Sequence, residues 1–201
     1  MADSNRPPPP RATVRVLTLC GSLRRASRSR VLLQACARLA PRDLQIEHFE
    51  DLGTLPLFNP DLEAAPPHAV GRFWTAVGQA DTLLIASPEY AHGITGVMKN
   101  ALDWLVGRTD FPGKPVALLN PSHRAEHADA ALREVLSTMN AQLLALQDPR
   151  IAVTACALDE ATLAATEPYA GQIRGALQAL AQALRPRGEE QSEPVEQTTP
   201  T

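Results

Sequence analysis

The sequence predicts an α/β fold in which five parallel strands alternate with helices in a doubly wound sheet. Short apolar runs alternate with longer segments of helical periodicity from residue 13 to residue 184. Strands that alternate with helices in this way pair in parallel through crossover connections. Polar, glycine-containing loops follow the first and the third apolar run, and ligand loops lie at the carboxyl ends of strands beside a switch point of the sheet. The positions of these loops predict the strand order 2-1-3-4-5.

Each expected strand is a short aliphatic run between polar or glycine-containing segments. In chain order the strands are expected at residues 13–19, 44–49, 82–86, 115–119 and 142–145. Each expected helix carries apolar residues at spacings of three and four, which gather on one face of the helix. In chain order the helices are expected at residues 29–39, 67–79, 97–105, 132–139 and 159–184. Leu32 and Cys36 mark the inward face of the first helix, and Leu177 and Leu180 mark that of the last.

The length and composition predict one domain between two loose ends. A chain of 201 residues with 44% hydrophobic residues can bury one sizeable core, which is expected within residues 12–185. Residues 1–11 contain a run of prolines, and residues 186–201 are rich in glutamate, proline, glutamine and threonine. Both ends are therefore expected to be disordered tails. The long, proline-rich connection at residues 51–67 is expected to fold over the site or to join a contact between subunits.

The composition also excludes several classes of partner. The formal net charge is -3, and no aromatic residues accompany the arginines of residues 24–30, so a nucleic-acid partner is not expected. Three cysteines without C-x-x-C spacing indicate a reducing compartment. No apolar run approaches the length of a membrane helix, and the first residues lack the apolar core of a signal peptide. The expectation is a soluble, cytoplasmic protein with no membrane partner.

The loop after the first expected strand has the composition of a phosphate-binding site. Serines at positions 22, 27 and 29 are interleaved with arginines at 24, 25, 28 and 30, at the start of the first expected helix. Free N–H groups at a helix N-terminus bind anions, and serine hydroxyls and arginine forks strengthen that binding.

The loop after the third expected strand predicts a platform for a planar ring. Residues 87–96 read SPEYAHGITG and lead directly into the third expected helix. Glycines allow a backbone to approach a ligand closely, and Tyr90 and His92 offer flat surfaces with polar tips. A phosphate site on one loop and a ring platform on the other predict a mononucleotide with a flat base, which is FMN.

Two motifs of the chain resemble those of the NADPH-dependent FMN reductase family. They are Gly21-Ser22-Leu23-Arg24 with Ser27, and Pro88-Glu89-Tyr90 followed by Gly96 and Lys99-Asn100-Ala101-Leu102-Asp103-Trp104. The resemblance implies a flavodoxin-like fold, bound FMN and NADPH as the electron donor. It also implies a small-molecule electron acceptor (free flavin, a quinone, an azo or nitro compound, or a metal oxyanion) and a homodimer or homotetramer. The chain departs from the family in having Ser29 where an asparagine is common, and Ala91, Gly93 and Thr95 where Asn-x-Ser-x-Pro is common.

The cofactor-binding residues are assigned from both arguments. They are expected to be Gly21, Ser22, Leu23, Arg24, Ser27, Ser29, Pro88, Glu89, Tyr90, Ala91, His92, Gly93, Ser122 and His123. No catalytic residue is expected, because the flavin carries the chemistry of hydride transfer, and Glu89 and Tyr90 are interpreted as flavin-site residues. Arg24, Arg25 and Arg28 are candidates for the FMN phosphate or the 2′-phosphate of NADPH, and the sequence does not assign them individually.

Alternatives from other classes of protein remain. A flavin-binding electron carrier would share the fold but lack turnover with NAD(P)H. A phosphatase loop needs Cys-x5-Arg, and Ala26 stands six residues after Cys20, so Cys20 is interpreted as a packed residue at the strand end. Residues 123–127 match the zinc signature H-x-x-E-H, yet no third ligand is evident and a metal site is not expected.

Overall fold

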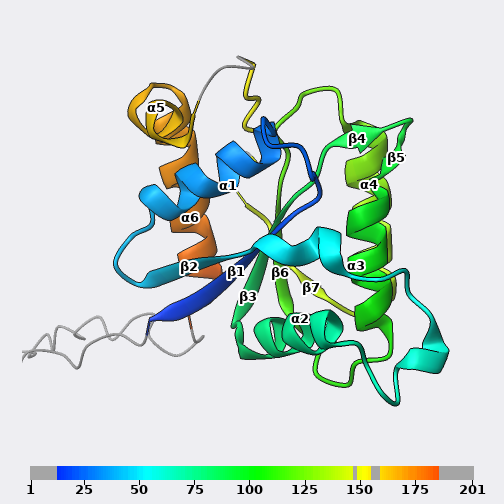
Figure 1. Ribbon diagram of the computed structural model, residues 1–201. Coiled ribbons are helices and arrows are strands. Elements are labelled where there is room, and N and C mark those ends of the chain that lie inside the picture. Colours follow the sequence, from blue (N-terminus) through cyan, green and yellow to red (C-terminus); the bar gives the residue numbers. More distant parts are fainter. Residues whose placement is uncertain (1–12, 147–148, 155–158, 186–201) are drawn as a thin grey trace, which may run out of the picture.

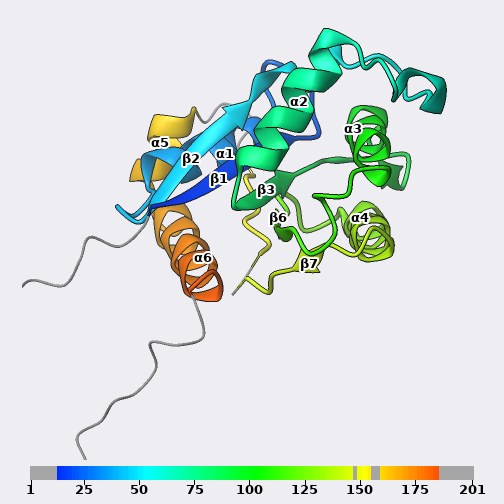
Figure 2. The ribbon, with the colours of Figure 1, turned by 90° about the horizontal axis from the view of Figure 1, so that it is seen from below.

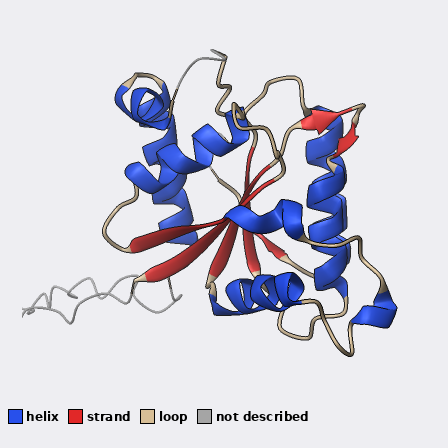
Figure 3. Ribbon diagram, viewed as in Figure 1, coloured by secondary structure: helices blue, strands red, loops and turns tan. Residues whose placement is uncertain are grey.

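Five strands form a parallel sheet at the centre of the computed structural model, which describes residues 13–146, 149–154 and 159–185 (Figure 1, and red arrows in Figure 3). Their bounds are β1 Val14–Cys20, β2 Leu44–Phe49, β3 Thr82–Ala86, β6 Pro115–Leu119 and β7 Gln142–Leu143. The spatial order is β2-β1-β3-β6-β7, and each neighbouring pair is parallel. The predicted order 2-1-3-4-5 and the flavodoxin-like fold are therefore confirmed.

Helices cover both faces of the sheet (Figure 2). Their bounds are α1 Arg28–Arg38, α2 His68–Gln79, α3 Gly96–Val106, α4 Glu126–Thr138, α5 Glu160–Ala165 and α6 Tyr169–Ala183. Phe73 of α2 and Trp104 of α3 are fully buried in the core on one face, and α4 joins them there. Leu32 of α1 and Ile173 of α6 are fully buried on the other face. Each helix therefore buries its apolar stripe against the sheet, as its periodicity predicts.

The last predicted helix is wrong in one respect. Residues 159–184 were expected to form one helix, but α5 ends at Ala165 and α6 starts at Tyr169. Pro168 lies between them, and a proline lacks the N–H that a helix interior requires and disfavours helix at the preceding residue. The periodic leucines indicated both segments, and the proline divides them.

A short hairpin lies in the segment that the sequence predicts as an exposed loop. β4 Glu89–Tyr90 pairs in antiparallel fashion with β5 Gly93–Ile94. Ala91 and His92 form the turn with φ of 50° and 58°, the left-handed conformation that a two-residue hairpin turn of this kind needs at both positions. Glycine and asparagine usually fill such positions, so the Ala-His pair concealed the hairpin from sequence inspection.

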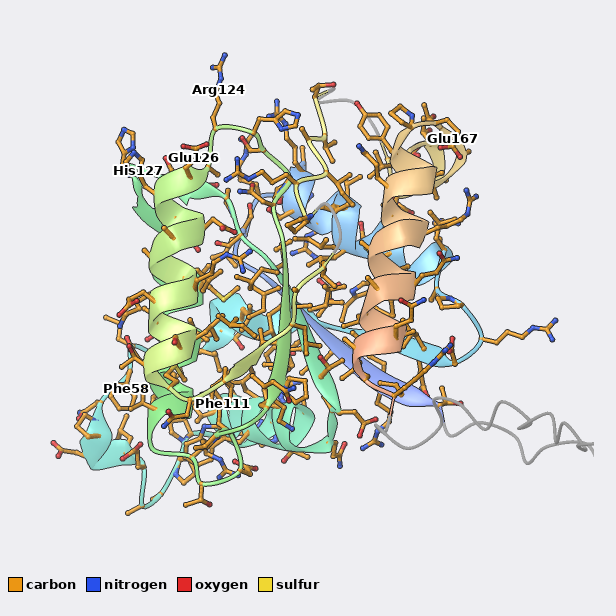
Figure 4. All side chains as sticks on the ribbon, turned by 180° about the vertical axis from the view of Figure 1, so that it is seen from behind. Phe58, Phe111, Arg124, Glu126, His127 and Glu167 are labelled. Atoms are coloured by element: carbon orange, nitrogen blue, oxygen red, sulfur yellow. The ribbon has the colours of Figure 1, made fainter. Side chains whose placement is uncertain are left out.

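The long connection before α2 is fastened to α3. It contains the 3-10 turns η1 Glu50–Thr54 and η2 Pro60–Leu62. The Asn100 amide accepts a hydrogen bond from Phe58 N (2.8 Å) and donates one to the Pro56 carbonyl (2.9 Å). The Phe58 ring packs edge-on against the Trp104 ring, and the two ring centroids lie 5.1 Å apart. Phe58 lies toward the opposite end of the molecule from Arg124 (Figure 4), whereas Gly53, near the start of the connection, lies against the Leu23 side chain of the loop after β1.

The two predicted tails, residues 1–11 and 186–201, and the third cysteine, Cys156, lie outside the described residues. Within the described ranges, no helix combines the length and the apolar character that crossing a membrane requires.

Candidate functional site

A cavity of about 750 Å³ lies at the carboxyl ends of the central strands. Its walls come from the loop after β1 with the start of α1, the loop after β3 with β4, the loop after β6, and the residues at the start of α5. Since β1 and β3 are neighbours in the sheet and their crossovers run in opposite directions, the cavity occupies the predicted switch point.

The start of α1 forms a cradle with an unsatisfied hydroxyl. Ser27 caps the helix, and its Oγ accepts a hydrogen bond from Arg30 N (3.3 Å). Ser22 is 3% exposed, and its Oγ accepts a weak hydrogen bond from Arg24 N (3.4 Å). Ser29 is 1% exposed, lines the cavity, and its Oγ has no hydrogen-bond partner. A buried hydroxyl without a partner is costly, so Ser29 Oγ at a helix N-terminus is suited to an anionic ligand.

Gly21 brings the two ligand loops together. Its N–H donates to the Ala86 carbonyl (2.9 Å), and a Cβ at this position would lie 2.1 Å from Ser87 Oγ. Ser87 Oγ in turn lies 3.4 Å from the hydroxyl of Thr95, which caps α3 by accepting from Met98 N (3.4 Å). The absence of a side chain at position 21 is what allows this close approach.

Cys20 is the last residue of β1, and its surroundings indicate a structural role. Its Sγ donates to the Ser22 carbonyl at 3.5 Å. Burial raises the pKa of the Cys20 thiol, and the hydrogen bond to Ser22 and the charge of Arg30 only partly oppose that effect. A thiol with a raised pKa stays protonated and is a poor nucleophile, which agrees with the interpretation of Cys20 as a packed residue.

Glu89 anchors the hairpin to α4. Its side chain is 14% exposed, and its Oε2 accepts a hydrogen bond from Ala128 N (2.9 Å) in the first turn of α4. Its Oε1 lies 3.4 Å from His92 Nδ1. The rings of His92 and His127 pack edge-on, with their centroids 4.4 Å apart. Tyr90, the next residue, is 51% exposed and lines the cavity. The carboxylate of Glu89 is therefore engaged in holding the platform that carries Tyr90.

The loop after β6 is ordered by Asn120. This residue is 5% exposed, its Nδ2 donates to the Ala125 carbonyl (2.9 Å), and its Oδ1 accepts from Ser122 N (3.0 Å). Ser122 Oγ accepts from Arg124 N (3.1 Å). Ser122, Arg124 and Ala125 all line the cavity, and the Arg124 side chain projects outward from the loop (Figure 4).

The cavity wall contains part of the expected site. Of the expected residues it includes Ser22, Arg24, Ser27, Ser29, Pro88, Glu89, Tyr90 and Ser122. It does not include Gly21, Leu23, Ala91, His92, Gly93 or His123. The Leu23 side chain lies against Gly53, and Ala91 to Gly93 form the tip of the hairpin.

Several lining residues were not anticipated from the sequence. They include Gln34, Pro121, Arg124, Val153, Asp159 and Glu160. Arg124 stands two residues after Ser122 in a loop already identified, so its position was a usable signal. Val153 and Asp159 reach the cavity only because the chain returns to it after β7, and no local pattern marks them.

The zinc signature is not assembled as a metal site. His123 precedes α4, whereas His127 lies within it and contacts His92. No group of three or more metal-ligating side chains occurs among the residues that the structure describes.

Comparison with known proteins identifies a family and several similar reductases. Residues 14–149 match the family described as NADPH-dependent FMN reductase. The chain is 33% identical to a quinone reductase from Pseudomonas putida over 152 residues, which cover 72% of this chain and 81% of that protein. It is 39% identical to a 2-hydroxy-1,4-benzoquinone reductase from Burkholderia sp over 112 residues, which cover 54% of this chain and 61% of that protein.

A solved structure resembles the fold closely. FerB, a flavoenzyme NAD(P)H:(acceptor) oxidoreductase from Paracoccus denitrificans, superimposes with a TM-score of 0.73 at 26% identity, and the match covers 86% of this chain and 97% of FerB. Several of the curated relatives are matched over only about 60% of their own length.

Proposed function

Because the chain belongs to the NADPH-dependent FMN reductase family, we propose that it is an NAD(P)H-dependent FMN oxidoreductase that reduces a small-molecule acceptor. The observation that carries this proposal is the buried, unpartnered Ser29 Oγ at the start of α1, in a cavity whose other wall presents Tyr90. An anion site and an aromatic platform at the switch point of one sheet match the two ends of a flavin mononucleotide.

The residues present fit the phosphate end of FMN. Ser29 Oγ supplies a hydrogen-bond donor that has no other use in the described structure. Ser22, Arg24 and Ser27, which belong to the same loop before α1, also line the cavity. Hydrogen bonds from such donors to a phosphate are charge-assisted and short, and the N-terminal dipole of α1 adds to them.

The opposite wall fits the ring end. Tyr90 and Pro88 offer flat apolar surface beside the polar Ser122. Bound FMN would supply the redox chemistry, taking a hydride from NAD(P)H and passing its electrons to the acceptor. Glu89 would act as a positioning residue, since its carboxylate already bonds Ala128 N and faces His92.

The acceptor and the assembly belong to the same proposal. We propose that the acceptor is a free flavin, a quinone, an azo or nitro compound, or a metal oxyanion. The acidic groups of the cavity wall already have hydrogen-bond or ion-pair partners, so access to the ring would select the acceptor. The quinone reductase names of several relatives favour a quinone. We also propose a homodimer or homotetramer in which a second subunit covers the ring edge.

Titration with FMN tests the proposal. The purified protein, or its apoprotein after addition of FMN, is expected to bind about one flavin per chain and to lose its visible absorbance on anaerobic mixing with NADPH. Ser29→Ala is expected to weaken FMN by about tenfold and riboflavin much less, because one charge-assisted hydrogen bond contributes ~1.5–3 kcal/mol. Ser137→Ala, at an exposed position near the end of α4, is the matched control and should leave both affinities unchanged.

Three results would contradict this assignment. A preparation that stays colourless at micromolar FMN would defeat flavin binding. A flavin that NADPH does not bleach would favour the electron carrier. Equal losses of FMN and riboflavin affinity in Ser29→Ala would mean that Ser29 only supports the fold.

A further inference from the structure

The chain has few side-chain amines. Of its 19 lysine and arginine residues, two are lysines, Lys99 and Lys114. A guanidinium keeps its proton in proteins, whereas a lysine amine that loses its proton becomes a nucleophile. The surroundings of these two lysines therefore decide which side-chain amine an electrophile meets in reactive form.

Lys99 is engaged by a carboxylate. It lies in the first half of α3, and its Nζ forms an ion pair with Asp103, one turn further along the same helix, at 2.5 Å. Both side chains of this pair are partly open to solvent. The nitrogen of Lys99 thus has a negative partner at hydrogen-bond distance.

Lys114 has a neutral partner instead. This partly buried residue lies immediately before β6, and its Nζ donates a hydrogen bond to the carbonyl of Ala80, the residue that follows α2 (2.8 Å). In the part of the chain that the structure describes, no carboxylate forms an ion pair with Lys114. A neutral amine still carries N–H donors, so Lys114 can lose its proton and keep the bond to Ala80.

Two carboxylates act on Lys114 from a distance, and each is bonded to another group. Asp81 Oδ2 accepts a hydrogen bond from Arg15 N (2.7 Å). The two carboxylate oxygens of Asp110 accept from the Arg108 guanidinium (2.9 and 2.7 Å). Burial lowers the pKa of the Lys114 ammonium, and the charges of Asp110 and Asp81 only partly oppose that effect. The geometry and the electrostatics therefore both favour the neutral amine at Lys114 over that of an ordinary lysine.

The bond from Lys114 fastens one side of the turn between α2 and β3. The other side is fastened to β1, because Asp81 N donates to the Arg15 carbonyl (2.9 Å). The Phe111 carbonyl accepts from Lys114 N (2.8 Å), and Phe111 lies toward the opposite end of the molecule from Arg124 (Figure 4). This turn is thus at the amino ends of the strands, away from the cavity.

We propose that Lys114 is the lysine of this protein that an activated acyl donor, such as an acyl phosphate, modifies preferentially, and that acylation releases the turn between α2 and β3. The neutral Nζ attacks the acyl carbon and forms a C–N bond. The bond from that carbon to the phosphate oxygen breaks, phosphate leaves with the electron pair, and the surplus proton on nitrogen passes to water. The product amide keeps one N–H but has no charge, and its acyl group needs space beside Ala80. This inference does not depend on the proposed function.

Acetylation of the intact protein tests the choice of lysine. After treatment with acetyl phosphate at about pH 8, site-resolved mass spectrometry is expected to show Lys114 acetylated several-fold faster than Lys99, which is the internal control. The difference should narrow as the pH is raised toward about 10.4, where an ordinary lysine is half deprotonated. A difference set by exposure alone would not depend on pH in this way.

The release of the turn has its own readout. Lys114→Gln removes the charge and resembles the acylated side chain, and amide exchange in residues 77–80 is expected to become about fivefold faster, as the loss of one hydrogen bond implies. Lys99→Gln is the matched control and should leave this exchange unchanged. Lys114→Arg keeps a charged donor and should preserve most of the protection, while the acetylated peptide at position 114 disappears.

Each part of the proposal has an outcome that overturns it. Acetylation of Lys99 as fast as that of Lys114, or a rate difference that does not narrow at high pH, would overturn the assignment of Lys114 as the preferred site. Unchanged exchange in residues 77–80 of Lys114→Gln, or equal acceleration in Lys99→Gln, would overturn the release of the turn.

Discussion

Gly21 shows how a single residue controls the geometry of the site. It lies between β1 and the phosphate cradle, and its Cα faces Ser87 of the neighbouring loop so closely that a Cβ would meet Ser87 Oγ at 2.1 Å. The loop after β1 and the loop after β3 can therefore lie against each other because position 21 has no side chain.

Gly21→Ala is predicted to lower the free energy of unfolding by about 1–3 kcal/mol, since it forces an overlap in a packed region. Denaturant unfolding measures the change. Ser87→Gly in the same chain removes the overlapping side chain and should restore part of the loss.

Gly71→Ala provides the matched control for this substitution. Nothing lies within 4 Å of a Cβ at position 71, the fourth residue of α2, so the same change there should stabilise the protein by about 0.5–1 kcal/mol. A loss at position 71, or no loss at position 21, would contradict the account of the loop contact.

At the scale of elements, the β4–β5 hairpin depends on a neighbouring helix. Its two strands contribute only the pairs Glu89–Ile94 and Tyr90–Gly93, and an isolated hairpin of that size is not stable in water. Glu89 supplies the missing support by accepting the hydrogen bond from Ala128 N, where the positive end of the α4 dipole favours a carboxylate.

Glu89→Gln keeps the shape of the side chain and removes its charge. Amide hydrogen exchange in residues 88–95 is predicted to become about tenfold faster, which corresponds to a loss of about 1.4 kcal/mol of local stability. Exchange in β1 should not change.

Glu134→Gln is the control for the hairpin, because Glu134 is an exposed glutamate on the same helix. If exchange in residues 88–95 is unaffected by Glu89→Gln, or is accelerated equally by Glu134→Gln, then Glu89 does not hold the hairpin.

At the scale of the whole molecule, the structure changes the choice of residue for testing assembly. The sequence predicts that the connection at residues 51–67, which contains Phe58, folds over the site or joins a contact between subunits. Phe58 itself packs on Trp104, so a charge there would damage the chain's own fold. Leu57 is 84% exposed and Val106 is 62% exposed, and neither exposed side chain serves the core.

Leu57→Asp is therefore predicted to shift the molecular mass toward a monomer of 21.6 kDa and to lower turnover with it, while the melting temperature of the monomer is retained. Light scattering and steady-state kinetics on one sample measure both. Full turnover by a wild-type monomer at micromolar concentration would refute the assembly. Loss of mass with undiminished turnover would show that the interface does not shape the site.

Periodicity and loop chemistry were sufficient to predict the architecture and two of the loops that line the cavity. Strand order follows from alternating strands and helices and from the two polar loops, and both loops do line the cavity. The break in the last helix could have been predicted from Pro168. The hairpin could not be predicted, because Ala91 and His92 are unusual residues for a left-handed turn.

The sequence by itself determined which loops meet at the cavity, because apolar periodicity and the parallel topology place the carboxyl ends of the strands at one edge of the sheet. Only the tertiary structure decided that Ser29 Oγ has no partner, that Glu89 bonds α4, and that Arg124 joins Arg25 at one cavity. The physical reason is the separation along the chain of the residues that interact. Periodicity and turn preference arise between residues close in sequence, whereas the partners of a polar or charged side chain are set by segments that meet only when the chain is folded.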